Sequence, residues 1–293
     1  MSAQTGSPEL PVSGYDGLKR VTPTRVTTPQ ALSNGILAVI AVVFAIPLLW
    51  LILASVDSHA NWDIALPHFT LANFGTALEA GRAHSLLVSV EISTVATLVA
   101  TVTGTLAAYS FSRRHIPWKG PVLLFILFLS GVPISVIIIP VFQVFSQHGW
   151  LTEMPTAVFL GVTALPFEIW IIKNFIDAVP FELEEAARVE GASTLTVIRR
   201  LVVPLALPGI AAAAIYGFVN AWGAFLIPLV LITETSEQPG AISVYSFISG
   251  SAGINYGEIA AFSILYSLPV VLLYGAMGRL FKGGFVLSGA LRG

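Results

Sequence analysis

A polar stretch between positions 180 and 204 gathers charged side chains within an otherwise apolar sequence. It opens with a proline that can start a helix, followed by three carboxylates that favour the positive N-terminal end of a helix: Glu182, Glu184 and Glu185. Glu184 and Arg188 have the spacing of a helical ion pair. Gly191 ends this helix, and Ser193 can cap a second one. We therefore expect two short helices that meet at a glycine turn, with an apolar side that can press on another surface, formed by Phe181, Ala186, Ala187 and Val189.

Two further carboxylates lie inside apolar runs, where a charge is costly and usually faces a cavity or a partner. Glu91 lies about 8 Å from the outer end of its run at 1.5 Å per residue, a depth close to the lipid headgroups. Glu168 lies roughly 18 Å deep. Two interpretations of Glu168 stay open: a residue of a solute pathway, or a packed, protonated or helix-bonded side chain.

The sequence lacks the residue patterns needed for ATP binding, metal binding or catalysis, and it lacks the charge typical of nucleic-acid binding. The sequence has no Gly-x-x-x-x-Gly-Lys-Ser/Thr phosphate loop, so an ATP site of that kind is not expected. It has no cysteine, and its five histidines are scattered without metal-ligand spacing, so no metal or cofactor is expected in this chain. No nucleophile with a base and an orienting group is evident, which argues against an enzyme. A net charge of −2 gives no reason to expect a nucleic-acid partner.

The elements that position these residues must sit in lipid. Of 293 residues, 55% are hydrophobic and 10% are charged, against roughly 25% charged residues in an ordinary soluble domain. A spanning helix needs about 20 mostly apolar residues. Six runs come near this length: Gly35 to Ala54, Leu86 to Tyr109, Pro121 to Phe142, Thr156 to Ile172, Leu205 to Ile232 and Ile259 to Met277. Because lipid offers the backbone no hydrogen bonds, the predicted fold is all-α, a polytopic membrane helix bundle of about six transmembrane helices.

The basic residues predict the orientation of this bundle. With the N-terminus inside, 13 of the 14 Lys and Arg residues fall on the cytoplasmic side, and Arg82 alone lies outside. Both termini are then cytoplasmic. Residues 1–33, rich in Ser, Thr, Pro and Gly, are expected to form a disordered cytoplasmic tail. Residues 34–293 form the membrane domain, with the polar hairpin at 177–204 on its cytoplasmic face.

The hairpin resembles a known motif. Glu185-Ala186-Ala187, then Gly191, then Leu201-Val202-Val203-Pro204 is similar to the EAA loop of permease subunits of ATP-binding-cassette importers. Other stretches resemble the maltose-type carbohydrate permeases, so that the likeness covers about residues 36 to 293: Ala107 to Arg113, Leu165 to Phe167 with Trp170, and Gly283 to Gly293. The fold expected from this resemblance is the same helix bundle.

The resemblance implies function and partners. The ATPase-coupling residues would be Glu185, Ala186, Ala187, Gly191 and Pro204, with Glu185 pairing with a basic residue of a cytoplasmic ATPase. That partner would bind the ATP and magnesium. Two copies of the ATPase, a second permease and an extracytoplasmic substrate-binding protein would complete an importer in the bacterial inner membrane, in contact with its lipid. The tail Gly289 to Gly293 would also reach the ATPase.

The solute pathway is less defined. Tyr216, Asn220 and Trp222 could stack on and hydrogen-bond a sugar, together with Glu168, although Trp222 fits packing equally well. Gly223 and Ala224 stand where related permeases often carry polar residues, which weakens any inference about the sugar. A proton-coupled secondary transporter using Glu91 or Glu168 is the main alternative, although such proteins usually have repeated halves, which are not evident here. A membrane-bound enzyme or scaffold is the third.

Overall fold

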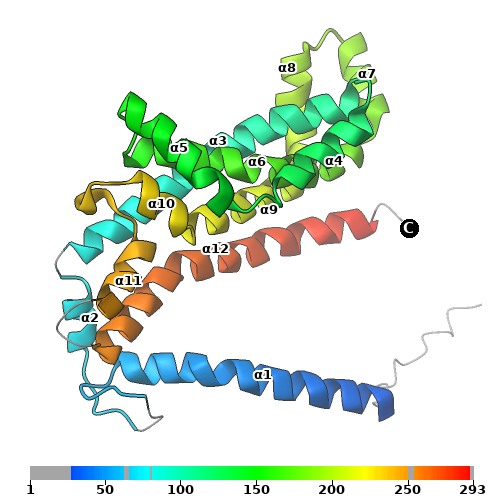
Figure 1. Ribbon diagram of the computed structural model, residues 1–293. Coiled ribbons are helices and arrows are strands. Elements are labelled where there is room, and N and C mark those ends of the chain that lie inside the picture. Colours follow the sequence, from blue (N-terminus) through cyan, green and yellow to red (C-terminus); the bar gives the residue numbers. More distant parts are fainter. Residues whose placement is uncertain (1–27, 63–65, 80, 250–253, 291–293) are drawn as a thin grey trace, which may run out of the picture. The chain divides into compact units, whose positions relative to one another are not determined.

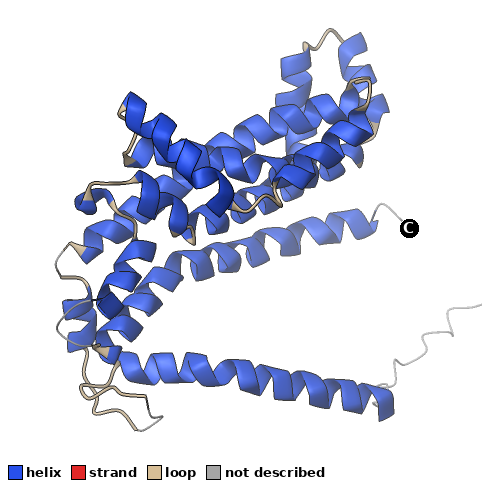
Figure 2. Cartoon of the chain, viewed as in Figure 1, coloured by secondary structure: helices blue, strands red, loops and turns tan. Residues whose placement is uncertain are grey.

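The computed structural model describes residues 28–62, 66–79, 81–249 and 254–290 of the chain. It divides into two compact units, residues 1–49 and 50–293. Within the described residues all regular secondary structure is helical, and β-structure is limited to one isolated bridge between Asp57 and Phe69 (Figure 2). The all-α class predicted from the sequence is confirmed.

Helix α1, Thr28–Ser55, is the most hydrophobic of the candidate spans in the described part of the chain. Its large apolar side chains are exposed along the first unit, as at Phe44, which is 71% exposed. The span predicted at 35–54 is therefore confirmed. Of the predicted disordered tail, residues 1–27 lie outside the described residues, whereas α1 already begins at Thr28.

Three helices form the centre of the second unit: α3 (Arg82–Arg113), α6 (Glu153–Asp177) and α9 (Val203–Trp222). Each packs against the other two (Figure 1). With α1 and α12 (Tyr256–Ala290), they are the five helices long and apolar enough to cross a membrane within the described part of the chain. The shorter helices are α2 (Ala72–Ala77), α4 (Lys119–Leu129), α5 (Ile134–His148), α7 (Phe181–Val189), α8 (Thr194–Val197), α10 (Leu226–Leu231) and α11 (Gly240–Ser249).

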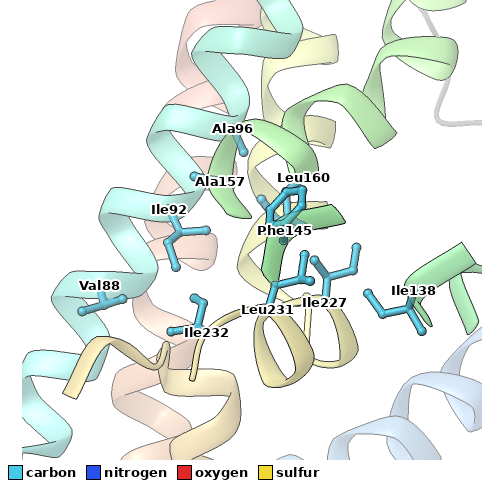
Figure 3. Close-up of a cluster of buried hydrophobic side chains, with 11 residues drawn as sticks. Val88, Ile92, Ala96, Ile138, Phe145, Ala157, Leu160, Ile227, Leu231 and Ile232 are labelled. Atoms are coloured by element: carbon cyan, nitrogen blue, oxygen red, sulfur yellow. The ribbon is translucent and has the colours of Figure 1, made fainter. Parts of the chain in front are cut away.

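Two buried apolar clusters hold the central helices together. The first cluster joins α3, α5, α6 and α10 through residues such as Ile92, Phe145 and Leu231 (Figure 3). The second cluster joins α3, α6 and α9 to the hairpin, because Val197 and Val202 of the hairpin are each 1% exposed within it. The hairpin is thus packed into the bundle and is more than a loop between spans.

Two predicted spans are not single helices. The run at 121–142 is divided into α4 and α5, which meet at an angle of 85°, so the described part of the chain has six candidate spans only if this bent pair counts as one. Pro133 explains the break, because proline disfavours helical geometry in the residue before it and lacks the N–H that the helix needs. The run at 205–232 ends as a helix at Trp222, and α10 follows after Gly223.

Candidate functional site

The polar hairpin lies at one end of the α3–α6–α9 bundle (Figure 1). Pro180 immediately precedes α7, and Gly191 makes the turn with a φ of 89°, a conformation that a side chain would strain. The Ser193 hydroxyl accepts a bond of 3.3 Å from the Thr196 N–H and caps α8. The helix, glycine turn and capped second helix predicted from the sequence are therefore present.

The second helix of the hairpin continues into α9 through a π-turn at Ile198–Val202. The N–H of Val203 bonds to the carbonyl of Ile198, five residues earlier. Pro204 follows at the start of α9 and has no N–H to donate to an α-helical bond at this point. The wider turn lets the chain run from the hairpin into the membrane helix without a loop, so the two parts form one continuous element.

Glu184 fixes the other half of the hairpin to the bundle. Its side chain is fully buried, and its Oε1 accepts a bond of 2.6 Å from Nε of Arg113. The same guanidinium donates through Nη2 to the carbonyls of Ile176 at 2.9 Å and Val179 at 2.7 Å. The Ile176 carbonyl lies in the last turn of α6, where it also accepts a bond of 3.0 Å from the Val179 N–H, and Val179 follows just after the helix. Arg113 of α3 therefore caps α6 and holds α7 at the same time.

Two more side chains complete the bonds of Glu184. The Tyr109 hydroxyl, one turn before Arg113, donates to Oε2 at 3.0 Å. Arg188 lies 3.5 Å from the same oxygen and donates to the Tyr109 hydroxyl at 3.1 Å, which confirms the ion-pair spacing expected with Glu184. Both carboxylate oxygens are thus bonded, the condition under which a buried charge is tolerated.

The neighbouring face of the hairpin is free of such contacts in the described structure. Glu185 and Ala186 are exposed, and Ala187 is half-buried between the two faces. Apolar side chains accompany them, with Val189 89% and Leu195 70% exposed. Pro204 lies apart from this face, at the base of α9. The coupling residues predicted from the sequence therefore fall into two groups: three on α7, and two that shape the backbone, Gly191 at the turn and Pro204 at the start of α9.

Glu168 occupies the centre of the bundle. It is fully buried in α6, and its Oε2 accepts a bond of 3.1 Å from the Thr101 hydroxyl of α3. Its Oε1 has no hydrogen-bond partner among the described residues. That oxygen lies against Gly217 of α9, where a Cβ atom would come within 2.2 Å of it. Glu91, by contrast, is exposed on α3.

The three residues of α9 predicted to contact the solute lie in two different environments. Tyr216 and Asn220 line a cavity of about 360 Å³ between α9 and α12, together with Tyr274 and Met277. Trp222 is 4% exposed and donates from Nε1 to the Tyr266 carbonyl at 3.1 Å, while the Tyr266 hydroxyl donates to the Trp222 carbonyl. The structure thus gives Trp222 the packing role, as a clamp between α9 and α12. Neither Trp222 nor Glu168 is among the residues that line this cavity.

Comparisons with known proteins agree with this architecture. The family of binding-protein-dependent transport system inner membrane components matches residues 100–284. A Synechocystis permease for uptake of osmoprotective compounds is 29% identical over 86% of this chain and 89% of its own length. The diacetylchitobiose uptake permease of Streptomyces coelicolor is 28% identical over 89% of both chains.

A solved structure has the same fold. In a bacterial ABC transporter that imports the acidic polysaccharide alginate, one chain superposes with a TM-score of 0.73 and 17% identity, covering 89% of this chain and all of that one. The family match spans more than half of the sequence, including the end of α3, all of α6 and α9, and the hairpin. The chain therefore belongs to the inner-membrane components of binding-protein-dependent transport systems, as a multi-pass ABC transporter permease of the cytoplasmic membrane.

Proposed function

We propose that the chain forms half of the translocation pathway of a carbohydrate importer and couples that pathway to a separate ATPase. The complex pairs it with a second permease, two ATPase subunits that bind ATP and magnesium, and an external substrate-binding protein. ATP-driven closure of the ATPases moves the hairpin, and the bundle alternates between outward and inward access.

The two-sided hairpin carries this proposal. One side is bonded through Glu184 to the ends of α3 and α6, so that a force on the hairpin reaches both helices. The other side presents the Glu185 carboxylate beside exposed apolar residues. This combination suits docking into a groove, where apolar contact excludes water and an ion pair sets the register.

A carbohydrate fits the lining of the cavity beside α9. Aromatic rings stack on sugar faces, and amide groups hydrogen-bond to hydroxyls, and here Tyr216, Tyr274 and Asn220 supply both. The uptake of diacetylchitobiose by one relative and of alginate by the transporter of similar fold supports the same class. Glu168 lies behind this cavity lining, where its carboxyl contacts Gly217.

The coupling is tested by charge reversal on two faces of the membrane. Glu185→Lys should weaken docking by about 2 to 5 kcal/mol, because it leaves a basic group of the ATPase unpaired in a desolvated groove. The readouts are co-purification with the ATPase and hydrolysis stimulated by the loaded binding protein. Glu79→Lys, at an exposed carboxylate of an outer loop, is the control and should retain both. Normal assembly and stimulation in Glu185→Lys would disprove the contact.

The solute class is tested in proteoliposomes that contain the whole complex. Neutral di- and oligosaccharides, loaded on the binding protein, should stimulate ATP hydrolysis, whereas amino acids should not. Asn220→Ala should lower uptake without loss of assembly, because the residue lines the cavity and is exposed to it. Uptake by the chain without ATPase, driven by a pH gradient, would instead support the proton-coupled alternative.

A further inference from the structure

A second cluster of chemically active side chains lies in the two segments that follow α1 and precede α2. Asp57, His59 and His68 each offer one ligand atom there, and these three atoms lie within 4.8 Å of one another. By the orientation predicted from the basic residues, this is the outer side of the membrane, opposite the hairpin. The separations of two and eleven residues from Asp57 explain why the histidines look scattered in the sequence.

The backbone holds the two segments in register. The Ser58 N–H donates to the His68 carbonyl at 3.1 Å, and the Thr70 N–H donates to the Val56 carbonyl at 2.8 Å, on either side of the antiparallel bridge. The buried Asn73 amide donates to the Asp57 carbonyl at 2.9 Å. The three side chains therefore project from a fixed frame, so that little ordering is needed to bring them together.

Hydrogen bonds with neighbouring protein groups already orient two of the three side chains, Asp57 and His59. The Oδ1 atom of Asp57 accepts backbone bonds of 3.1 Å from His59 and 2.9 Å from His68, while its Oδ2 accepts none from the described residues. Nδ1 of His59 lies 2.9 Å from the Ser58 hydroxyl, which leaves Nε2 of that ring. Metal-binding histidines and carboxylates are usually held in this way by a second partner.

We propose that Asp57, His59 and His68 bind a divalent transition-metal cation, for which Zn²⁺ is the best match. Two imidazoles and one carboxylate are a common Zn²⁺ donor set, with water in the remaining position. Ligand atoms about 2.0–2.2 Å from Zn²⁺ stand roughly 3.4 Å apart in a tetrahedron, so the side chains must close slightly. The imidazoles can do so, because both histidines are exposed and their rings already meet edge to face at 5.2 Å.

The test uses the purified full-length chain, in detergent and without a polyhistidine tag. Titration calorimetry with Zn²⁺ should give one ion per chain, and Co²⁺ should give the visible absorption of a four-coordinate site. His59→Ala and His68→Ala should each weaken binding more than about 100-fold, because loss of even a second partner costs 10- to 100-fold. Ser58→Ala should weaken it about 10-fold through the His59 ring.

His148→Ala is the matched control, since His148 is exposed and its ring lies against Trp150, away from the cluster. It should bind Zn²⁺ as the unaltered chain does. The thermal midpoints of all variants without metal should agree, which shows that the fold is retained. Absence of stoichiometric Zn²⁺ binding by the unaltered chain, or equal binding by the His59→Ala/His68→Ala double variant, would overturn the proposal. Neither result bears on the ATPase contact.

Discussion

Two carboxylates of this chain are equally buried but are held in opposite ways. Glu184, at the end of the bundle that carries the hairpin, is bonded on both oxygens and paired with Arg113. Glu168, in the middle of the bundle, has a single bond from Thr101 and an oxygen without a partner among the described residues. Glu184 links α7 to α3 through an ion pair, whereas Glu168 is accommodated between helices because Gly217 has no side chain. Burial alone therefore says little about what a membrane carboxylate does.

Removing the charge at the hairpin should have the largest effect. Glu184→Ala leaves the Arg113 guanidinium, whose side chain is 10% exposed, without its partner, and such a loss costs about 3–5 kcal/mol. The free energy of unfolding in detergent measures this, with hydrogen exchange of the α7 amides as a local readout. Glu185→Ala, at the adjacent exposed position, should change stability by less than about 0.5 kcal/mol.

Replacing both partners sharpens the interpretation. Glu184→Leu combined with Arg113→Met should be markedly more stable than either single variant, because no unpaired charge remains buried. Equal stability of Glu184→Ala and Glu185→Ala would show that the ion pair does not hold the hairpin.

Adding one methyl group at Gly217 tests the shape fit of Glu168. Gly217→Ala should cost about 1–3 kcal/mol by overpacking, because its Cβ would lie 2.2 Å from Oε1. Glu168→Ala in the same chain should restore most of that loss, and a double-mutant cycle measures the coupling. Gly275→Ala, where an added Cβ would meet nothing within 4 Å beyond the backbone of its own helix and its two chain neighbours, is the control. Simple addition of the two losses would contradict the contact.

Neutralising Glu168 should have a smaller effect still. Glu168→Gln keeps an oxygen for the Thr101 hydroxyl and removes no ion pair, so the expected change is below about 1 kcal/mol. ATP-driven uptake should also persist. Abolished uptake with unchanged stability would show that the acid itself is needed, and would favour proton coupling.

The smallest change is expected at the rim of the hairpin. Arg188 has a side chain 39% exposed, and its contact with Glu184 is 3.5 Å long. Helical pairs of this spacing contribute about 0.3–0.5 kcal/mol when both side chains are exposed. Glu184 is buried, but its two oxygens keep their bonds from Arg113 and Tyr109 when Arg188 is removed. Arg188→Ala should therefore shift the unfolding free energy by no more than this amount, measured against Arg113→Ala. A loss as large as that of Arg113→Ala would mean that the two arginines share the charge.

Local patterns account for most of what the sequence predicted correctly. The Glu184 to Arg188 spacing, the Ser193 cap and the turn at Gly191 all depend on neighbours within one turn. The apolar runs likewise place α3, α6 and α12, because a bilayer forces long helices on such residues. These features need no knowledge of the tertiary structure.

Contacts between distant segments were missed. Arg113 and Glu184 are separated by 71 positions, and no periodicity connects them. A signal was available: Tyr109 and Arg113 stand one turn apart at the end of a span, where a polar pair on one face requires a partner. The 85° bend was also missed, although Gly131 and Pro133 lie in the middle of the predicted span.

That bend has a consequence for how the chain meets its surroundings. Eleven residues of α4 rise only about 16 Å, roughly half of a hydrocarbon layer about 30 Å thick. A helix of this length that starts at the membrane surface ends near mid-depth, and all four residues of the break at 130–133 are exposed on this chain. Acyl chains cannot satisfy the carbonyl groups of an interrupted helix. In a bilayer, this bend must be covered by another polypeptide or must face an aqueous vestibule. The isolated chain would otherwise expose backbone carbonyl groups to lipid.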